Sequence, residues 1–105
     1  MNSISVDELA ALGREASILD VREDDEYAEA RVPGAKSVPL SRLEASLGEL
    51  PPRRPVYVMC ASGGRSAKAT AFLAGQGFDA VNVLGGITEW YRSGHPVDFG
   101  PQGLR

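Results

Sequence analysis

The chain alternates short apolar runs with stretches in which apolar residues recur at helical spacing. The runs at 18–21, 56–59 and 80–84 have the length and composition of strands. A further extended segment is expected at 37–40, where Pro39 limits it to the edge or the end of a sheet. Helices are expected between these runs, so the pattern predicts an α/β sandwich built on a mainly parallel sheet.

Capping and breaking residues mark the expected helices. Ser5 and Glu8 have the spacing of a capping box, and Gly13 ends the short helix that they begin. The alanine-rich stretch 65–74 predicts a second helix, and residues 87–92 predict the last one.

A further helix is predicted over 41–50. Ser41 and Glu44 form a second capping box there, and the three leucines that follow keep the i, i+4, i+7 spacing of a core-facing helix: Leu43, Leu47 and Leu50. Prolines at 51, 52 and 55 close this segment.

Length and charge limit the possible functions. A chain of 105 residues is the size of one domain, which we expect to span residues 1–97, followed by a poorly ordered tail at 98–105 that is rich in glycine and proline. The formal net charge of -3 argues against a nucleic-acid partner. The lack of a long apolar stretch argues against a membrane partner, and the first fifteen residues do not have the pattern of a signal peptide. We therefore expect a soluble, cytoplasmic protein.

The composition also excludes several kinds of site. One cysteine, Cys60, and one histidine, His95, can form neither an internal disulfide nor a complete zinc site. The acidic run at 23–26 is interpreted as a solvated helix start rather than as a metal site. We therefore expect no metal and no cofactor, and any chemistry at Cys60 is thiol chemistry.

The most informative segment lies between the strand at 56–59 and the helix at 65–74. Cys60 follows the strand, and Gly63 and Gly64 permit a tight concave turn. A loop that ends in a helix N-terminus directs backbone N–H groups at one point, which makes an anion site. The loop residues that would form this anion site are Ala61, Ser62, Gly63, Gly64, Arg65 and Ser66.

Cys60 at this position is predicted to be a reactive thiolate, because thiol pKa values fall at helix N-termini and beside arginine. The alternative is a small buried hydrophobic residue, which free cysteines often are. His95 lies far along the chain beside Pro96 and is interpreted as a surface residue rather than as a base for Cys60.

Four segments resemble the rhodanese-type sulfurtransferases, and together they cover the chain from Ile4 to Val97. The loop Cys60–Ser66 resembles the active-site loop of that family. The other three segments resemble its opening helix, its first signature and its C-terminal signature: Ile4 to Leu9; Asp20-Val21-Arg22 with Glu26-Tyr27 and Val32-Pro33-Gly34-Ala35; and Leu84-Gly85-Gly86-Ile87 through Trp90 to Pro96-Val97.

The resemblance implies a three-layer sandwich with helices on both faces of the sheet, and a double-displacement sulfur transfer. Cys60 would take a sulfane sulfur from thiosulfate or another small anionic donor and pass it to a thiol, to cyanide or to a protein acceptor. Backbone amides of the loop would stabilise the persulfide, and Arg65 would add a positive charge for the anionic donor.

Two alternative functions remain open. Dual-specificity phosphatases and an arsenate reductase share the fold but place the arginine one position later, whereas here four residues separate Cys60 from Arg65. The other alternative is a non-catalytic or sulfur-carrier module that acts through a partner.

Residues outside the loop are candidates for supporting and packing roles. Asp20 and Arg22 end the first strand, where ligands of open α/β sheets gather. We favour a structural ion pair of Arg22 with Glu26, and the alternative is that Asp20 supports the loop through a hydrogen bond to Ser66. Arg31 stands where many members of the family have a histidine. Trp90 and Tyr91 are interpreted as packing residues.

Overall fold

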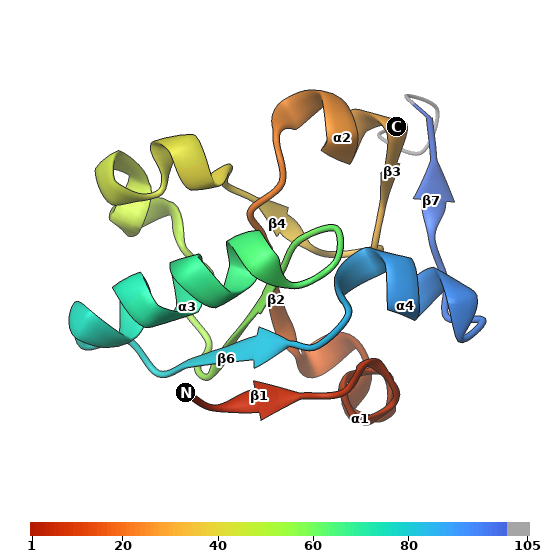
Figure 1. Ribbon diagram of the computed structural model, residues 1–105, viewed down its shortest axis with the longest axis horizontal. Coiled ribbons are helices and arrows are strands. Elements are labelled where there is room, and N and C mark those ends of the chain that lie inside the picture. The colour runs from red at the N-terminus through yellow and green to blue at the C-terminus, as the bar shows by residue number, and fades with distance from the viewer. Residues whose placement is uncertain (101–105) are drawn as a thin grey trace.

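The computed structural model describes residues 1–100, which form a central sheet of five parallel strands and a separate two-stranded sheet (Figure 1). The central strands are, in sheet order, β1 (Ser3–Ile4), β6 (Ala80–Val83), β5 (Val56–Met59), β2 (Ser17–Asp20) and β4 (Lys36–Ser37). This confirms the predicted α/β fold with a mainly parallel sheet.

Helices cover both faces of the central sheet. The described residues contain four α-helices: α1 (Val6–Leu12), α2 (Asp24–Glu29), α3 (Gly64–Gly75) and α4 (Gly86–Arg92). Short 3₁₀ segments lie at Gly13–Glu15, Leu40–Arg42 and Glu44–Glu49. The first helix begins with the predicted capping box, in which the Glu8 amide donates to Ser5 Oγ and the Ser5 amide donates to the Glu8 carboxylate.

Two hydrophobic clusters show that the sheet is the middle of three layers. Val56 and Val58 of β5 point into the cluster that contains Leu73 of α3, whereas Met59 points into the cluster that contains Leu9 of α1 and Trp90 of α4. This alternation follows from the two-residue period of a strand. The helices α1 and α4 therefore share one face of the sheet, and α3 covers the other.

The segment 41–50 differs from its prediction. It forms 3₁₀ turns rather than a capped α-helix, and Ser41 Oγ donates to the Glu23 carboxylate instead of capping a helix. Ser46 has φ −121°, which breaks the segment, and the prolines that follow leave little length for a regular helix. Leu43 and Leu50 are nevertheless buried in the core, as predicted.

The first residues of the segment predicted as a poorly ordered tail form a strand instead. Asp98–Phe99 form β7, which pairs antiparallel with β3 (Ala30–Arg31). Arg31 also contacts the residue that follows β7, because its guanidinium donates to the carbonyl oxygen of Gly100. The rest of the predicted tail, 101–105, lies outside the described residues. Within residues 1–100, none of the helices is both long and apolar enough for a membrane crossing.

Candidate active site

Cys60 lies directly after β5, at the carboxyl end of the parallel sheet, and only 1% of its surface is exposed. The backbone amide of Gly63 donates to Cys60 Sγ at 3.1 Å. The hydroxyl oxygen of Ser66 lies 3.4 Å from the same sulfur. The Cys60 thiol is thus positioned by residues of the loop that follows it.

The loop turns sharply at Gly63 and passes straight into α3. Gly63 has φ +119°, a conformation that side-chain-bearing residues rarely adopt, and it is the residue that immediately precedes the helix. The helix begins at Gly64, close to the predicted start. The backbone amides at its N-terminus therefore lie beside Cys60.

Hydrogen bonds set the acidity of the Cys60 thiol. Burial by itself raises the pKa of Cys60, because it disfavours the charged thiolate. The hydrogen bonds outweigh burial and leave the pKa below that of an ordinary cysteine; they come from the Ser66 hydroxyl and from the backbone amides of Ser66, Gly63 and Ser62.

The N-terminus of α4 supports the loop from the other side, which the sequence analysis missed. The Ile87 amide donates to the Cys60 carbonyl oxygen at 2.9 Å, and the Thr88 amide donates to the Ala61 carbonyl oxygen at 3.0 Å. Gly86 packs closely against the backbone of the thiol loop. A Cβ at Gly86 would overlap with the Cys60 carbonyl oxygen and lie 2.6 Å from the Ala61 carbonyl oxygen. The glycine pair that follows a predicted strand was the available signal.

Arg65 forms a bidentate ion pair with Glu26 of α2. Its two terminal nitrogens lie 2.6 Å and 2.9 Å from the carboxylate oxygens of Glu26. The hydrogen bonds from Arg65 lower the pKa of Glu26 to about 2, although partial burial opposes this shift. The predicted Arg22–Glu26 ion pair is therefore wrong, because Arg65 occupies the carboxylate.

The Glu26 pKa predicts how stability depends on pH. A carboxylate whose pKa falls from 4.5 to about 2 on folding stabilises the protein above pH 4.5 and loses this effect as the pH falls toward 2. We expect Glu26→Gln to lower the free energy of unfolding by about 1 kcal/mol or less at pH 7, because the pair is one-third exposed. Urea titrations from pH 7 to 3 should show the difference from wild type shrinking.

The matched control for this prediction is Asp25→Asn, which removes an acidic group from an exposed position of the same helix. A difference between wild type and Glu26→Gln that stayed constant from pH 7 to 3 would contradict the assigned ion pair.

Asp20 and Arg22 pair with each other rather than with the loop. Arg22 donates to both carboxylate oxygens of Asp20, at 2.7 Å for the shortest contact, and both side chains are buried. The Arg22 guanidinium also donates to the carbonyl oxygens of Glu26 and Ala30. The pair therefore anchors α2 to the end of β2 and so positions the partner of Arg65.

Ser66 does not bond to Asp20, and that alternative is wrong. Its hydroxyl lies 2.6 Å from Oδ1 of Asn82, a buried residue of β6. The signal in the sequence was an asparagine within an apolar strand, because asparagine is disfavoured there unless its side chain finds a partner.

His95 is held away from the loop. Its Nε2 lies 2.7 Å from Oδ1 of Asp7 in α1, and its ring packs against Trp90. Trp90 is buried, whereas Tyr91 is exposed and packs edge-on against Phe99. In the described part of the chain, no group of three or more His, Cys, Asp or Glu side chains is arranged to hold a metal ion.

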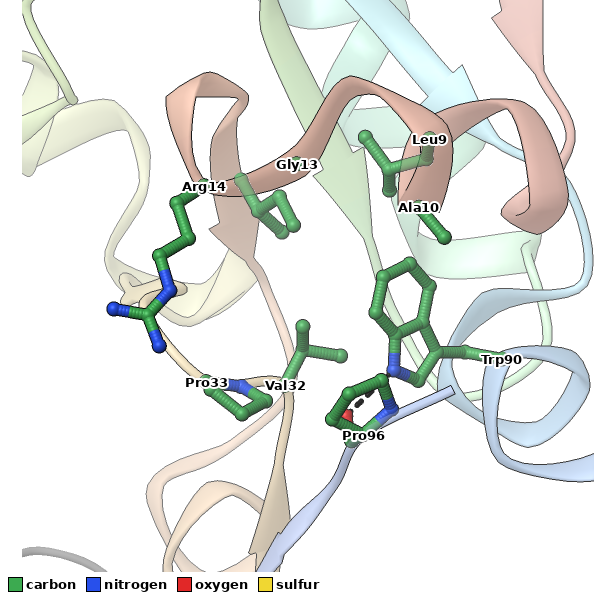
Figure 2. Close-up of a pocket in the computed structure, with 9 residues that line it drawn as sticks. Leu9, Ala10, Gly13, Arg14, Val32, Pro33, Trp90 and Pro96 are labelled. Carbon is green, nitrogen blue, oxygen red and sulfur yellow. Dashed lines mark hydrogen bonds between the residues drawn. The ribbon is translucent and has the colours of Figure 1, made fainter. Parts of the chain in front are cut away.

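The apolar pocket in Figure 2 is separate from this loop. It has a volume of about 240 Å³ and lies where Leu9 and Ala10 of α1 face Trp90, Val32 and Pro96. The Trp90 indole N–H donates to the Pro96 carbonyl oxygen at 2.7 Å. Neither Cys60 nor any residue of its loop lines this pocket, so its size does not mark the site of thiol chemistry.

Comparisons with known proteins identify the family. The family model for the rhodanese-like domain matches residues 5–93. A sulfurtransferase of Allochromatium vinosum is 34% identical over 98% of this chain and 96% of its own length. The YrkF protein of Bacillus subtilis, whose name proposes a sulfur carrier, is 41% identical over 70% of this chain but only 40% of its own length.

Solved structures agree with this result. A rhodanese-related protein of Thermoplasma volcanium superposes with a TM-score of 0.88 at 34% identity, covering 93% of this chain and 98% of that one. A rhodanese-like domain protein of Staphylococcus aureus gives 0.80 at 40% identity, over 86% and 91% of the two chains. With the thiol loop at the end of β5, these matches show that the chain belongs to the rhodanese-like domain family and that its relatives include sulfurtransferases.

Proposed function

We propose that this chain is a sulfurtransferase that carries a sulfane sulfur as a persulfide on Cys60. The observation that carries the proposal is the hydrogen bond from the Gly63 amide to Cys60 Sγ, in a loop whose hydrogen bonds lower the pKa of that thiol. A lowered pKa gives more thiolate near neutral pH, and the thiolate is the nucleophilic form of cysteine.

The reaction proceeds in two displacements. In the first, the Cys60 thiolate attacks the outer sulfur of a donor such as thiosulfate; a new S–S bond forms, the donor's S–S bond breaks, and sulfite leaves with the electron pair. In the second, cyanide or an acceptor thiolate attacks the outer sulfur of the persulfide, and Cys60 leaves as a thiolate. The complete cycle consumes no external oxidant or reductant.

The single cysteine makes discharge depend on an outside nucleophile. Because the sequence contains no second cysteine, no resolving thiol within the chain is available to remove the sulfur. The sulfurtransferase and sulfur-carrier names of the relatives agree with an external acceptor. We propose a small thiol, cyanide or a protein thiol for this step.

The experiment that tests the proposal is incubation with thiosulfate, followed by intact-mass measurement before and after a thiol is added. We expect the mass of one sulfur atom to appear on the protein and then to be lost to the thiol. The same incubation is repeated with glutathione persulfide as the donor. If neither donor produces this adduct, the proposal is overturned. Hydrolysis of an aryl phosphate that depends on Cys60 would instead favour the phosphatase alternative.

The Arg65–Glu26 pair leads to a prediction on donor choice. Because Glu26 neutralises Arg65 in the resting site, Glu26→Gln should free the guanidinium for an anion. We expect kcat/KM for thiosulfate to rise about threefold or more in Glu26→Gln and to fall similarly in Arg65→Ala, since a charge-assisted hydrogen bond contributes on the order of 1 kcal/mol. Steady-state assays of sulfite release measure both.

The control donor is the persulfide of a small uncharged thiol. Its kcat/KM should change less than that for thiosulfate in both variants. Equal changes for the two donors would show that the pair only shapes the loop.

A further inference from the structure

Asn82, on a strand next to the thiol loop, completes a buried chain of three polar side chains. Cys60 Sγ lies 3.4 Å from Ser66 Oγ, which lies 2.6 Å from Asn82 Oδ1. The exposed fractions of Cys60, Ser66 and Asn82 are 1%, 0% and 6%. Because these three polar groups are buried, their hydrogen-bond donors and acceptors must be matched mainly with one another.

The proton count is satisfied when Cys60 is a thiol. The S–H group donates to Ser66 Oγ, and the Ser66 hydroxyl donates to Asn82 Oδ1. The 2.6 Å separation is typical of an O–H···O hydrogen bond. The Gly63 carbonyl oxygen, 3.1 Å from Ser66 Oγ, already accepts from the Ala67 amide and does not need this proton.

The same arrangement fails when Cys60 loses its proton to solvent. A thiolate only accepts hydrogen bonds, and Ser66 has a single hydroxyl proton. While that proton points at Asn82 Oδ1, Ser66 presents a lone pair to the negative sulfur. If it turns to Sγ instead, Asn82 Oδ1 meets the Ser66 oxygen at 2.6 Å with no proton between them.

An amide resolves this conflict, because its two ends have nearly the same shape but opposite hydrogen-bonding character. We propose that Asn82 is a positioning residue, whose side-chain amide turns end for end when Cys60 becomes a thiolate. Nδ2–H then donates to Ser66 Oγ, and the Ser66 hydroxyl donates to Sγ. The inference rests on the proposed function in that it concerns the thiolate that attacks the donor.

Within residues 1–100, charged side chains on the elements packed around the loop form ion pairs with one another, and the variants below leave these pairs unchanged. They come from each of the elements packed around the loop: Arg65 of α3 with Glu26 of α2, Asp20 at the end of β2 with Arg22, and Glu89 of α4 with Arg92. A change in the Cys60 titration on replacing Asn82 is therefore attributed to the hydrogen-bonded chain.

The pH dependence of Cys60 alkylation by iodoacetamide tests the proposal in four proteins: wild type, Asn82→Leu, Ser66→Ala and the double variant. Leucine is similar in size to asparagine and has no donor. We expect Asn82→Leu to raise the alkylation midpoint by about one pH unit, roughly a tenfold loss of thiolate below it. In the Ser66→Ala background the same substitution should cause no further shift.

The sign of the shift distinguishes the proposal from a simpler role. If Asn82 only competes with the thiolate for the Ser66 proton, its removal should lower the midpoint, and that result would overturn the proposal. An equal shift with and without Ser66 would also overturn it. Alkylation requires no sulfur donor, so missing persulfide with a raised midpoint would count against the proposed function alone.

A measurement on the wild-type chain covers the case in which Asn82→Leu does not fold. The side-chain ¹⁵N resonance of Asn82 should shift with the same midpoint as Cys60 alkylation, and it should not titrate there in Cys60→Ser. A resonance that stays constant while wild-type Cys60 titrates would overturn the proposal.

Discussion

Cys60→Ser is expected to lower sulfur transfer by at least about 1,000-fold, because loss of a covalent nucleophile removes the pathway itself. A serine hydroxyl fits beside Ser66 and the Gly63 amide, but it does not ionise near neutral pH as a thiol does. The sulfur adduct should also disappear, since the chain contains no other cysteine. Sulfite release and intact mass measure the two effects.

The thermal unfolding midpoint is the control for this variant. It should change little, because serine is close to cysteine in size and the loop keeps its backbone hydrogen bonds. A serine variant that folds and still acquires sulfur from thiosulfate would place the chemistry elsewhere and exclude Cys60 as the carrier.

Gly86→Ala is expected to lower both stability and sulfur transfer strongly. Gly86 has φ +58°, and a Cβ there would overlap with the Cys60 carbonyl oxygen. Backbone strain and overpacking together should lower the free energy of unfolding by about 3 kcal/mol or more. The carbonyl groups of Cys60 and Ala61 must move, so sulfur transfer should fall even in molecules that remain folded.

Two other glycines separate strain from contact. Gly77 has φ +90° with open space around its Cα, so Gly77→Ala should lower stability by about 1–2 kcal/mol through backbone strain alone. Gly75, the last residue of α3, has neither restriction, and Gly75→Ala should be neutral or stabilising by about 0.5–1 kcal/mol. Both controls should keep full activity.

Urea unfolding and sulfite release, measured on the three variants, test whether the N-terminus of α4 restrains the thiol loop. If Gly86→Ala proved no worse than Gly77→Ala in both stability and activity, α4 would not restrain the thiol loop. A selective loss of activity in Gly86→Ala would show that the α4 N-terminus positions Cys60.

Much of the local structure followed from the sequence. The capping box at Ser5 and Glu8 formed as predicted, because its partners are three residues apart and the same chain segment supplies donor and acceptor. The capping box predicted at Ser41 did not form. Ser41 bonds to Glu23 instead, a residue that local spacing does not relate to it.

In the candidate site, too, some features follow from the local sequence and others depend on tertiary contacts. The sequence by itself determined that Cys60 follows a strand and precedes a glycine-rich helix start. The spacing of apolar residues and the glycines of a turn are signals that lie within a few residues of one another. The sequence also limited the chain to one thiol and one histidine, which makes an external sulfur acceptor necessary in the proposed mechanism.

Only the tertiary structure decided the partners of that loop. The sheet order brings β6 beside β5, so Asn82 meets Ser66 and the α4 amides reach the carbonyl oxygens of Cys60 and Ala61. The tertiary structure also places α2 where Glu26 forms its ion pair with Arg65. These pairs are separated by 16 or more residues, so short-range pattern carries no information about them; they form because packing the sheet and its helices brings their elements together.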